Sequence, residues 1–100
     1  MIYDLDKEIV MNTKRLVISN LDHETTAEHL EKLFATYGDV NKITVKKKRG
    51  LGFVEMMSVS EARRVREKLD GSTLWGRSMR IHGMTDTLHD RISYLFGKMF

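Results

Sequence analysis

The chain has 100 residues, no cysteine, and 17 basic against 14 acidic side chains, which gives a formal net charge of +3. This length predicts a single domain, and the lack of cysteine excludes disulfides and thiolate metal sites. The histidines are scattered, the acidic N-terminus lacks a signal-peptide pattern, and no stretch is apolar for long enough to span a membrane. We therefore expect a protein without metal, cofactor or membrane contact, in the cytoplasm or, in a eukaryote, in the nucleus.

The first half of the chain predicts two strands separated by a helix. Residues 15–20 alternate as a strand with Leu16 and Ile18 facing inward. The helix begins near Thr25 or Thr26, and Thr25 with Glu28 offers a capping box. Its apolar stripe consists of Leu30, Leu33, Phe34 and Tyr37. The second strand covers residues 40–46, with Val40, Ile43 and Val45 as its inward side chains.

The second half repeats this order of elements. A short basic connection ends at Gly50, and a third strand covers residues 51–57. Ser58 and Glu61 form a capping box for a second helix. The buried stripe of this helix consists of Ala62, Val65 and Leu69. A fourth strand covers residues 78–82, with Met79 and Ile81 as its inward side chains.

Segments at both ends lie outside this pattern. Residues 1–13 form an N-terminal extension with loosely helical spacing of apolar residues. Residues 84–100 carry apolar side chains at helical spacing, which predicts an amphipathic C-terminal helix. Its stripe consists of Leu88, Ile92, Leu95, Phe96 and Met99. A helix with so apolar a face needs a surface to cover, either on its own sheet or on a second copy of the chain.

Two motifs in the central segment carry a family resemblance. Arg49 to Met56 reads Arg-Gly-Leu-Gly-Phe-Val-Glu-Met, and Leu16 to Leu21 reads Leu-Val-Ile-Ser-Asn-Leu about 30 residues earlier. In this order and spacing they resemble the octamer and hexamer strands of the RNA recognition motif, over residues 14–83. The resemblance implies an α+β, ferredoxin-like split βαβ fold of order βαββαβ, with a four-stranded antiparallel sheet and two helices on one face.

The resemblance also implies that single-stranded RNA binds on the face of the sheet that the helices leave open. Of the three positions that are usually aromatic, Val17 and Leu51 are aliphatic here and only Phe53 carries a ring. Phe53 is therefore expected to be an exposed platform for a base, within a basic rim. The predicted RNA-binding residues are Val17, Ser19, Lys42, Thr44, Lys46, Lys47, Lys48, Arg49, Leu51, Phe53, Glu55, Arg80 and His82. Single-stranded DNA is an alternative ligand.

The sequence also suits a function other than RNA binding. The aliphatic side chains at stacking positions, together with the C-terminal stripe, suit a protein-interaction or dimerisation module. In that case the helix would cover the sheet, or two copies would associate through Leu88, Ile92, Leu95 and Phe96. The sequence shows no paired carboxylates at a pocket, no Ser/His/Asp set and no phosphate-binding glycine loop, so we expect no enzymatic activity.

Overall fold

The computed structural model describes residues 12–84, so the predicted N-terminal extension up to residue 11 and the predicted C-terminal helix lie outside the described residues. The possible association of two copies through that helix lies outside them too. The elements are β1 (Arg15–Ser19), α1 (Ala27–Ala35), β2 (Val40–Lys46), a 3₁₀ turn (Lys47–Arg49), β3 (Leu51–Met56), α2 (Val59–Leu69), β4 (Thr73–Leu74), β5 (Arg77–Ser78) and β6 (Arg80–Gly83).

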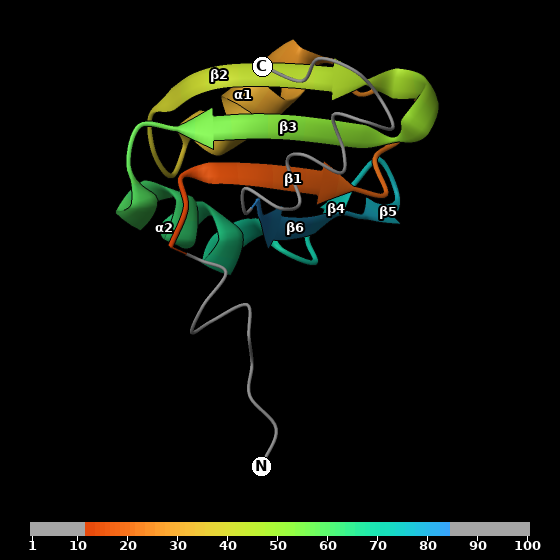
Figure 1. Ribbon diagram of the computed structural model, residues 1–100. Helices are drawn as coiled ribbons and strands as arrows, with labels where there is room; N and C mark the ends of the chain where they lie inside the picture. The colour runs from red at the N-terminus through yellow and green to blue at the C-terminus, as the bar shows by residue number, and fades with distance from the viewer. Residues whose placement is uncertain (1–11, 85–100) are drawn as a thin grey trace.

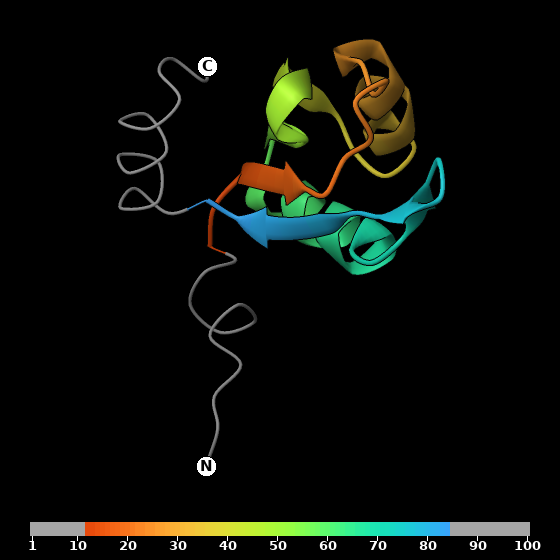
Figure 2. The same ribbon diagram turned by 90° about the vertical axis from the view of Figure 1, so that its right-hand side faces the viewer.

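The strands form one antiparallel sheet in the order β2-β3-β1-β6, and β4 pairs with β5 in a separate small hairpin. Both helices lie on the same side of the sheet, behind it in Figure 1, and Figure 2 shows the two layers from the side. The predicted α+β plan with two helices on one face is therefore confirmed. The opposite face, which neither helix covers, is called the open face below.

The core lies between the sheet and the two helices. Leu16 and Ile18 are fully buried there, as the alternation of β1 predicts. The stripes expected for the helices are also confirmed, since Leu30 and Phe34 of α1 and Val65 of α2 are fully buried. Because successive side chains of a strand point to opposite sides, this core fixes which residues reach the open face.

The start of α1 differs from the prediction by one residue. The N-cap is Thr26, whose hydroxyl oxygen accepts a hydrogen bond from the His29 backbone N–H at 3.1 Å, while the His29 Nδ1 accepts one from the Thr26 backbone N–H at 3.2 Å. The expected box of Thr25 and Glu28 is wrong, because Thr26 is the N-cap and the Thr25 side chain is fully buried. A neutral histidine ring nitrogen can replace the glutamate oxygen of a capping box.

A bulge in β2 sets the faces of its side chains. Val40 pairs with Met56 and Lys42 pairs with Glu55, which leaves Asn41 as an extra residue between two regular pairs. Val40 and Ile43 can therefore both pack against the core although they are three residues apart. From Lys42 onward the side chains alternate, with Lys42, Thr44 and Lys46 on the open face.

Gly52 allows α1 to approach β3 closely. A Cβ atom built at this position would lie 2.8 Å from Leu30 Cδ1 and 3.2 Å from Leu21 Cδ1. We expect Gly52→Ala to lower the free energy of unfolding by about 1–3 kcal/mol, because the added methyl group overpacks the core. Urea denaturation would measure this. Since Leu30 makes the closest contact, Leu30→Val in the alanine background should recover part of the loss, and simple addition of the two losses would contradict this account.

Candidate nucleic-acid interface

The strand register places the predicted site residues in rows across the open face. One row runs through Thr44, Phe53, Val17 and His82, one from each strand in the order β2-β3-β1-β6. The rows on either side continue the pattern. One contains Lys42, Glu55 and Arg15, while the other is formed by the pairs Lys46–Leu51 and Ser19–Arg80. The structure thus brings the predicted strand residues together on one face.

The centre of this face is closed to water, whereas its edges are not. Phe53 is fully buried, and Val17 and Glu55 are 7 % and 5 % exposed. Lys42 on β2 and Arg80 on β6 are exposed. The expectation that Phe53 is an exposed platform is therefore wrong for this structure, although the predicted direction of its side chain holds. Alternation along a strand fixes the direction of a side chain but not what lies over it.

Glu55 is a buried carboxylate held by two partners on the open face. Arg15 Nε donates a hydrogen bond to Glu55 Oε1 at 2.9 Å, and the Asn41 amide donates to Glu55 Oε2. Burial by itself disfavours the charged form of Glu55. The hydrogen bonds from Arg15 and Asn41, with the charges of Arg15 and Lys42, outweigh it and lower the pKa of the carboxyl below its ordinary value. Arg15 therefore offsets part of the negative charge that Glu55 brings to this face.

Arg15 and Asn41 were missed by the sequence analysis. The signal for Arg15 was present, because extending the alternation of β1 back from Val17 by two residues puts Arg15 on the open face. Asn41 gave no such signal. Its position depends on the bulge, and a bulge has no reliable pattern in a single sequence.

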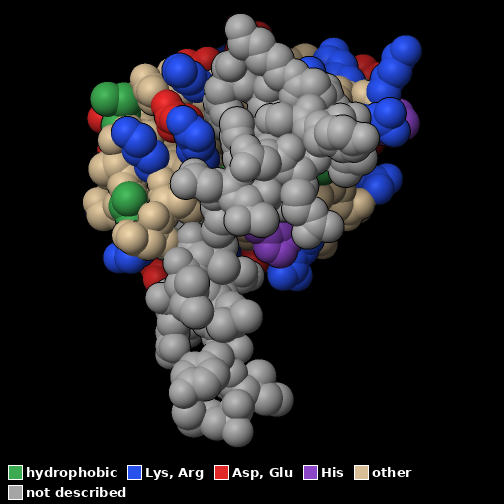
Figure 3. Space-filling model, viewed as in Figure 1, with side chains coloured by type: hydrophobic (Ala, Val, Ile, Leu, Met, Phe, Trp, Pro, Cys, Tyr) green, Lys and Arg blue, Asp and Glu red, His purple; other side chains and the backbone are tan. Residues whose placement is uncertain are grey.

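A short basic turn joins β2 to β3 beside this face. Lys47, Lys48 and Arg49 form a 3₁₀ turn of exposed residues that ends at Gly50, which has a φ of +65°. The Gly50 carbonyl oxygen accepts a hydrogen bond from the Leu21 backbone N–H at 3.0 Å, and a Cβ on Gly50 would lie 2.9 Å from the Leu21 carbonyl oxygen. This contact fixes the cationic turn against the end of β1. Figure 3 shows Lys and Arg side chains gathered at the upper right, where this turn lies in Figure 1.

The β6 edge supplies a cation that already has an acidic neighbour. Arg80 Nε lies 3.3 Å from Asp70 Oδ1, and the side chain of Arg80 is 58 % exposed. Asp70 Oδ1 also accepts a hydrogen bond from the Ile81 backbone N–H at 2.8 Å. Such an exposed ion pair is weak, so Arg80 can exchange Asp70 for another anion at little cost.

The exposed tryptophan belongs to a different part of the surface. Trp75 lies at the turn between β4 and β5, is 49 % exposed and makes an edge-to-face contact with His29 of α1, with ring centroids 4.7 Å apart. The hairpin is held to the end of β1 by Arg77 Nη2, which donates to Asn20 Oδ1 at 2.6 Å. Trp75 therefore packs at the edge of this hairpin against α1, and it is not assigned to the open face.

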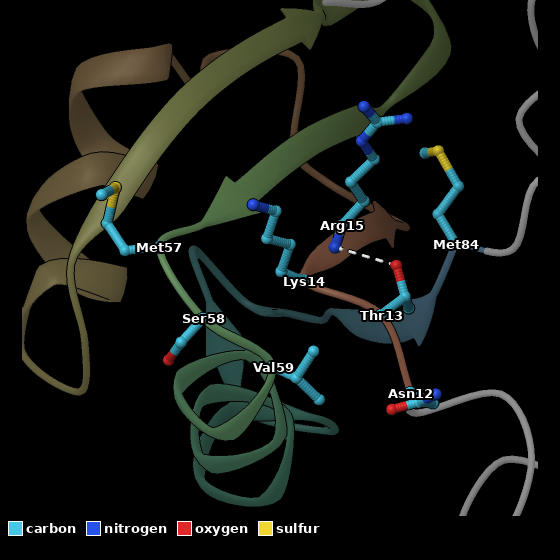
Figure 4. Close-up of a pocket in the computed structure, with 8 residues that line it drawn as sticks. All are labelled: Asn12, Thr13, Lys14, Arg15, Met57, Ser58, Val59 and Met84. Atoms are coloured by element: carbon cyan, nitrogen blue, oxygen red, sulfur yellow. Dashed lines mark hydrogen bonds between the residues drawn. The ribbon is translucent and has the colours of Figure 1, made fainter.

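An open hollow of about 560 Å³ lies where β1 begins and β6 ends. Figure 4 shows its lining residues, which include Lys14, Ser58 and Met84. The Ser58 hydroxyl is the N-cap of α2 and accepts a hydrogen bond from the Glu61 backbone N–H at 3.2 Å. The hollow lies beside the open face, and no residue of the octamer lines it.

Between Asn12 and Met84, no group of three or more His, Cys, Asp or Glu side chains could hold a metal ion. No helix of the same range is long and apolar enough to cross a membrane.

Comparison with known proteins gives consistent matches over this segment. The multiple RNA-binding domain-containing protein 1 of Dictyostelium discoideum is 35% identical over 72 residues, and paraspeckle component 1 of Homo sapiens is 34% identical over 71 residues. The aligned segments cover 67% and 71% of this chain but only 8% and 14% of these relatives. This chain therefore corresponds to a small part of each of them.

Solved structures match the same fold. The structure of the C. elegans NONO-1 homodimer has a TM-score of 0.69 and 28% identity, covering 72% of this chain and 29% of that one. The RNA binding protein PG1 has a TM-score of 0.68 and 29% identity, covering 74% of this chain and 96% of that one. The family model of the RNA recognition motif matches residues 16–80. The hexamer, the octamer and the sheet that joins them thus agree with this match, and the chain belongs to the RNA recognition motif family.

Proposed function

We propose that this chain binds single-stranded RNA on the open face of its sheet. The observation that carries the proposal is the row of Thr44, Phe53, Val17 and His82, which puts the octamer ring in the middle of a face that neither helix covers. The names of relatives support it, because one is a multiple RNA-binding domain-containing protein and another is a splicing factor. Binding of RNA by a sheet of this family needs no catalytic group, so we propose binding rather than catalysis.

The side chains of the face would have separate roles. Phe53 would stack on a base once it is uncovered, while Thr44 and His82 would donate or accept hydrogen bonds at base edges. Lys42, Lys46 and the basic turn would contact phosphates. Val17 and Leu51 offer apolar contact without a ring, so we expect modest affinity and limited sequence discrimination.

Replacing Phe53 with leucine tests this role, because it removes the aromatic ring and keeps an apolar side chain in its place. We expect Phe53→Leu to weaken binding of a fluorescent mixed-sequence RNA about 10-fold, because leucine keeps apolar contact but loses the stacking energy of about 1–3 kcal/mol per base. Fluorescence anisotropy at physiological salt would measure the affinity of the full chain. Unlabelled single-stranded DNA, added as a competitor, would test the alternative ligand.

The matched control is Phe34→Leu, which removes a fully buried ring from the core beneath the helices. It should lower the free energy of unfolding but leave the RNA affinity of the folded protein unchanged. Equal losses of affinity in the two variants would contradict the proposed role of Phe53. No binding by the unmodified chain would contradict RNA binding itself.

The place where the chain works stays a prediction. The names paraspeckle component 1 and splicing factor support the nuclear alternative rather than the cytoplasmic one. Because this chain spans so little of these relatives, their partners and processes are not carried over to it.

A further inference from the structure

The open face contains an apolar centre that the two helices do not account for. Phe53 is fully buried and Val17 is 7 % exposed, yet neither belongs to the core cluster between sheet and helices. The side chains of Lys42 and Arg80, at the two edges of the face, are exposed. Burial is thus confined to β1 and β3, the two central strands. A cover that lies along the middle of the face would produce this pattern.

We propose that residues 85–100 form an amphipathic helix that lies over Val17 and Phe53, and that RNA must displace this helix to reach the open face. Its contact residues would be Leu88, Ile92, Leu95 and Phe96. The competition with RNA rests on the proposed function. The docking of the helix does not depend on RNA binding, because it is a contact within the chain.

The end of the described chain is well placed for this contact. The Met84 backbone N–H donates a hydrogen bond to the Arg15 carbonyl oxygen at 2.8 Å, which holds the chain beside the start of β1. Neighbouring strands lie about 4.8 Å apart, so β3 is roughly 10 Å from β6 across β1. The segment from 85 to 100 would span about 24 Å as a helix, enough to cross both central strands.

The spacing of apolar residues favours residues 85–100 over the N-terminal residues as the cover of the open face. The apolar residues of this segment recur at the i, i+4, i+7, i+8 and i+11 positions of one helical face, beginning at Leu88. The apolar residues before β1, such as Ile2 and Ile9, are only loosely spaced. A regular stripe can bury a continuous apolar surface, whereas loosely spaced residues cannot.

Docking would lower the apparent affinity for RNA. If the uncovered form is about 1–10% of the population, RNA binds about 10- to 100-fold more weakly than it would bind to a permanently open face. A charged residue in the stripe should remove this difference. The loss caused by Phe53→Leu should then appear at its full size, because in the docked protein this substitution also weakens the contact with the helix, which offsets part of the loss.

The docking can be tested in the full chain without RNA. Because the chain has no cysteine, Asp90→Cys gives a single site for a nitroxide label on the polar side of the predicted helix. We expect the label to broaden the NMR signals of Val17 and Phe53. A label at Arg64→Cys, on α2, should broaden these two signals less than the label at position 90 does. Adding Ile92→Asp to the Asp90→Cys chain should restore them.

The competition is tested by RNA titration of unlabelled variants. Ile92→Asp should bind RNA about 10- to 100-fold more tightly than the unmodified chain, while the adjacent Ser93→Asp, which adds the same charge off the stripe, should bind as the unmodified chain does. Ile9→Asp serves as the matching variant at the other end of the chain and should also have no effect.

The outcomes separate the two proposals. Sharp signals of Val17 and Phe53 in the labelled chain would overturn the docking, and so would an effect of Ile9→Asp equal to that of Ile92→Asp. In a mixture of spin-labelled chains and unlabelled, isotope-enriched chains, broadening of the signals of the unlabelled chains would show that a second copy covers the face. That result would also overturn the docking within one chain. Broadening within one chain, without RNA binding by any variant, would support the docking and reject RNA binding. Equal RNA affinity of Ile92→Asp and the unmodified chain would overturn the competition.

Discussion

Replacing Lys46, Lys47 and Lys48 with glutamine should lower the affinity for single-stranded RNA about 100-fold in 0.1 M salt. Each phosphate contact with a single strand contributes about 0.7 to the slope of log affinity against log salt concentration, so the loss of three contacts should reduce the slope by about 2. The three cations belong to the end of β2 and the basic turn, which the Gly50–Leu21 contact fixes at the end of β1. Titrations at several salt concentrations would measure both quantities.

A control on the other side of the molecule separates local contact from total charge. Replacing Arg63, Arg64 and Lys68 of α2 with glutamine also removes three positive charges, so the formal net charge falls from +3 to 0 in both variants. We expect a much smaller change of affinity and slope in the α2 variant, since α2 lies behind the sheet (Figure 1). Equal slopes in the two variants would show that RNA responds to net charge and not to this face.

Replacing Arg15 with methionine should lower the free energy of unfolding by about 2–3 kcal/mol at neutral pH. The change removes the Arg15 hydrogen bond and leaves the buried Glu55 carboxylate with the one from the Asn41 amide, as far as the described residues show. Removing one partner of a buried ion pair costs about 3–5 kcal/mol. We expect less than this, because the Arg15 side chain is 40% exposed and water can take its place. Chemical denaturation would measure the loss.

The pH dependence of the free energy of unfolding should differ between the unmodified chain and the Arg15→Met variant. In the unmodified chain the pKa of Glu55 is lowered, so its ionised form stabilises the fold above the ordinary carboxyl pKa, and this contribution is lost as the pH falls through the lowered value. Without Arg15, the pKa of Glu55 should rise from this lowered value, because only Asn41 and Lys42 then oppose the effect of burial. The variant should therefore lose less stability on acidification than the unmodified chain does. The difference between the proteins should therefore shrink as the pH falls, and a constant difference would refute this explanation.

Arg80→Met is the matched control for Arg15→Met. It breaks the exposed pair with Asp70 and should cost at most about 1 kcal/mol. The double variant Arg15→Met with Glu55→Gln should recover part of the stability, because a neutral amide needs no cation.

The alternation of polar and apolar residues was enough to predict the sheet and its open face. Leu16 and Ile18 point toward the helices, so Val17 and Ser19 have to point away from them. Once the octamer assigned Phe53 to the same face, the set of strand residues on that face followed from the period of the strand. These predictions succeeded because they depend on backbone geometry, which a regular strand imposes on every residue.

The features that could not be predicted depend on contacts between distant residues. The choice of Thr26 over Thr25 as N-cap follows from the burial of Thr25, and no local pattern reveals that burial. The pairing of Glu55 with Arg15 joins two strands 40 residues apart in the chain. The burial of Phe53 likewise depends on what lies over the sheet. A single sequence contains the side chains for each contact but does not show which of them meet.

The bulge at Asn41 has a consequence for changes in chain length. Because Asn41 is the extra residue between the pairs Val40–Met56 and Lys42–Glu55, deleting it would join two regular pairs and leave every other side chain of β2 on its present side. Deleting Ile43, in contrast, would move the side chains on one side of the deletion to the opposite face of the sheet, since the side-chain period of a strand is two. Asn41 is thus the position at which β2 tolerates a deletion, at the cost of one hydrogen bond to Glu55.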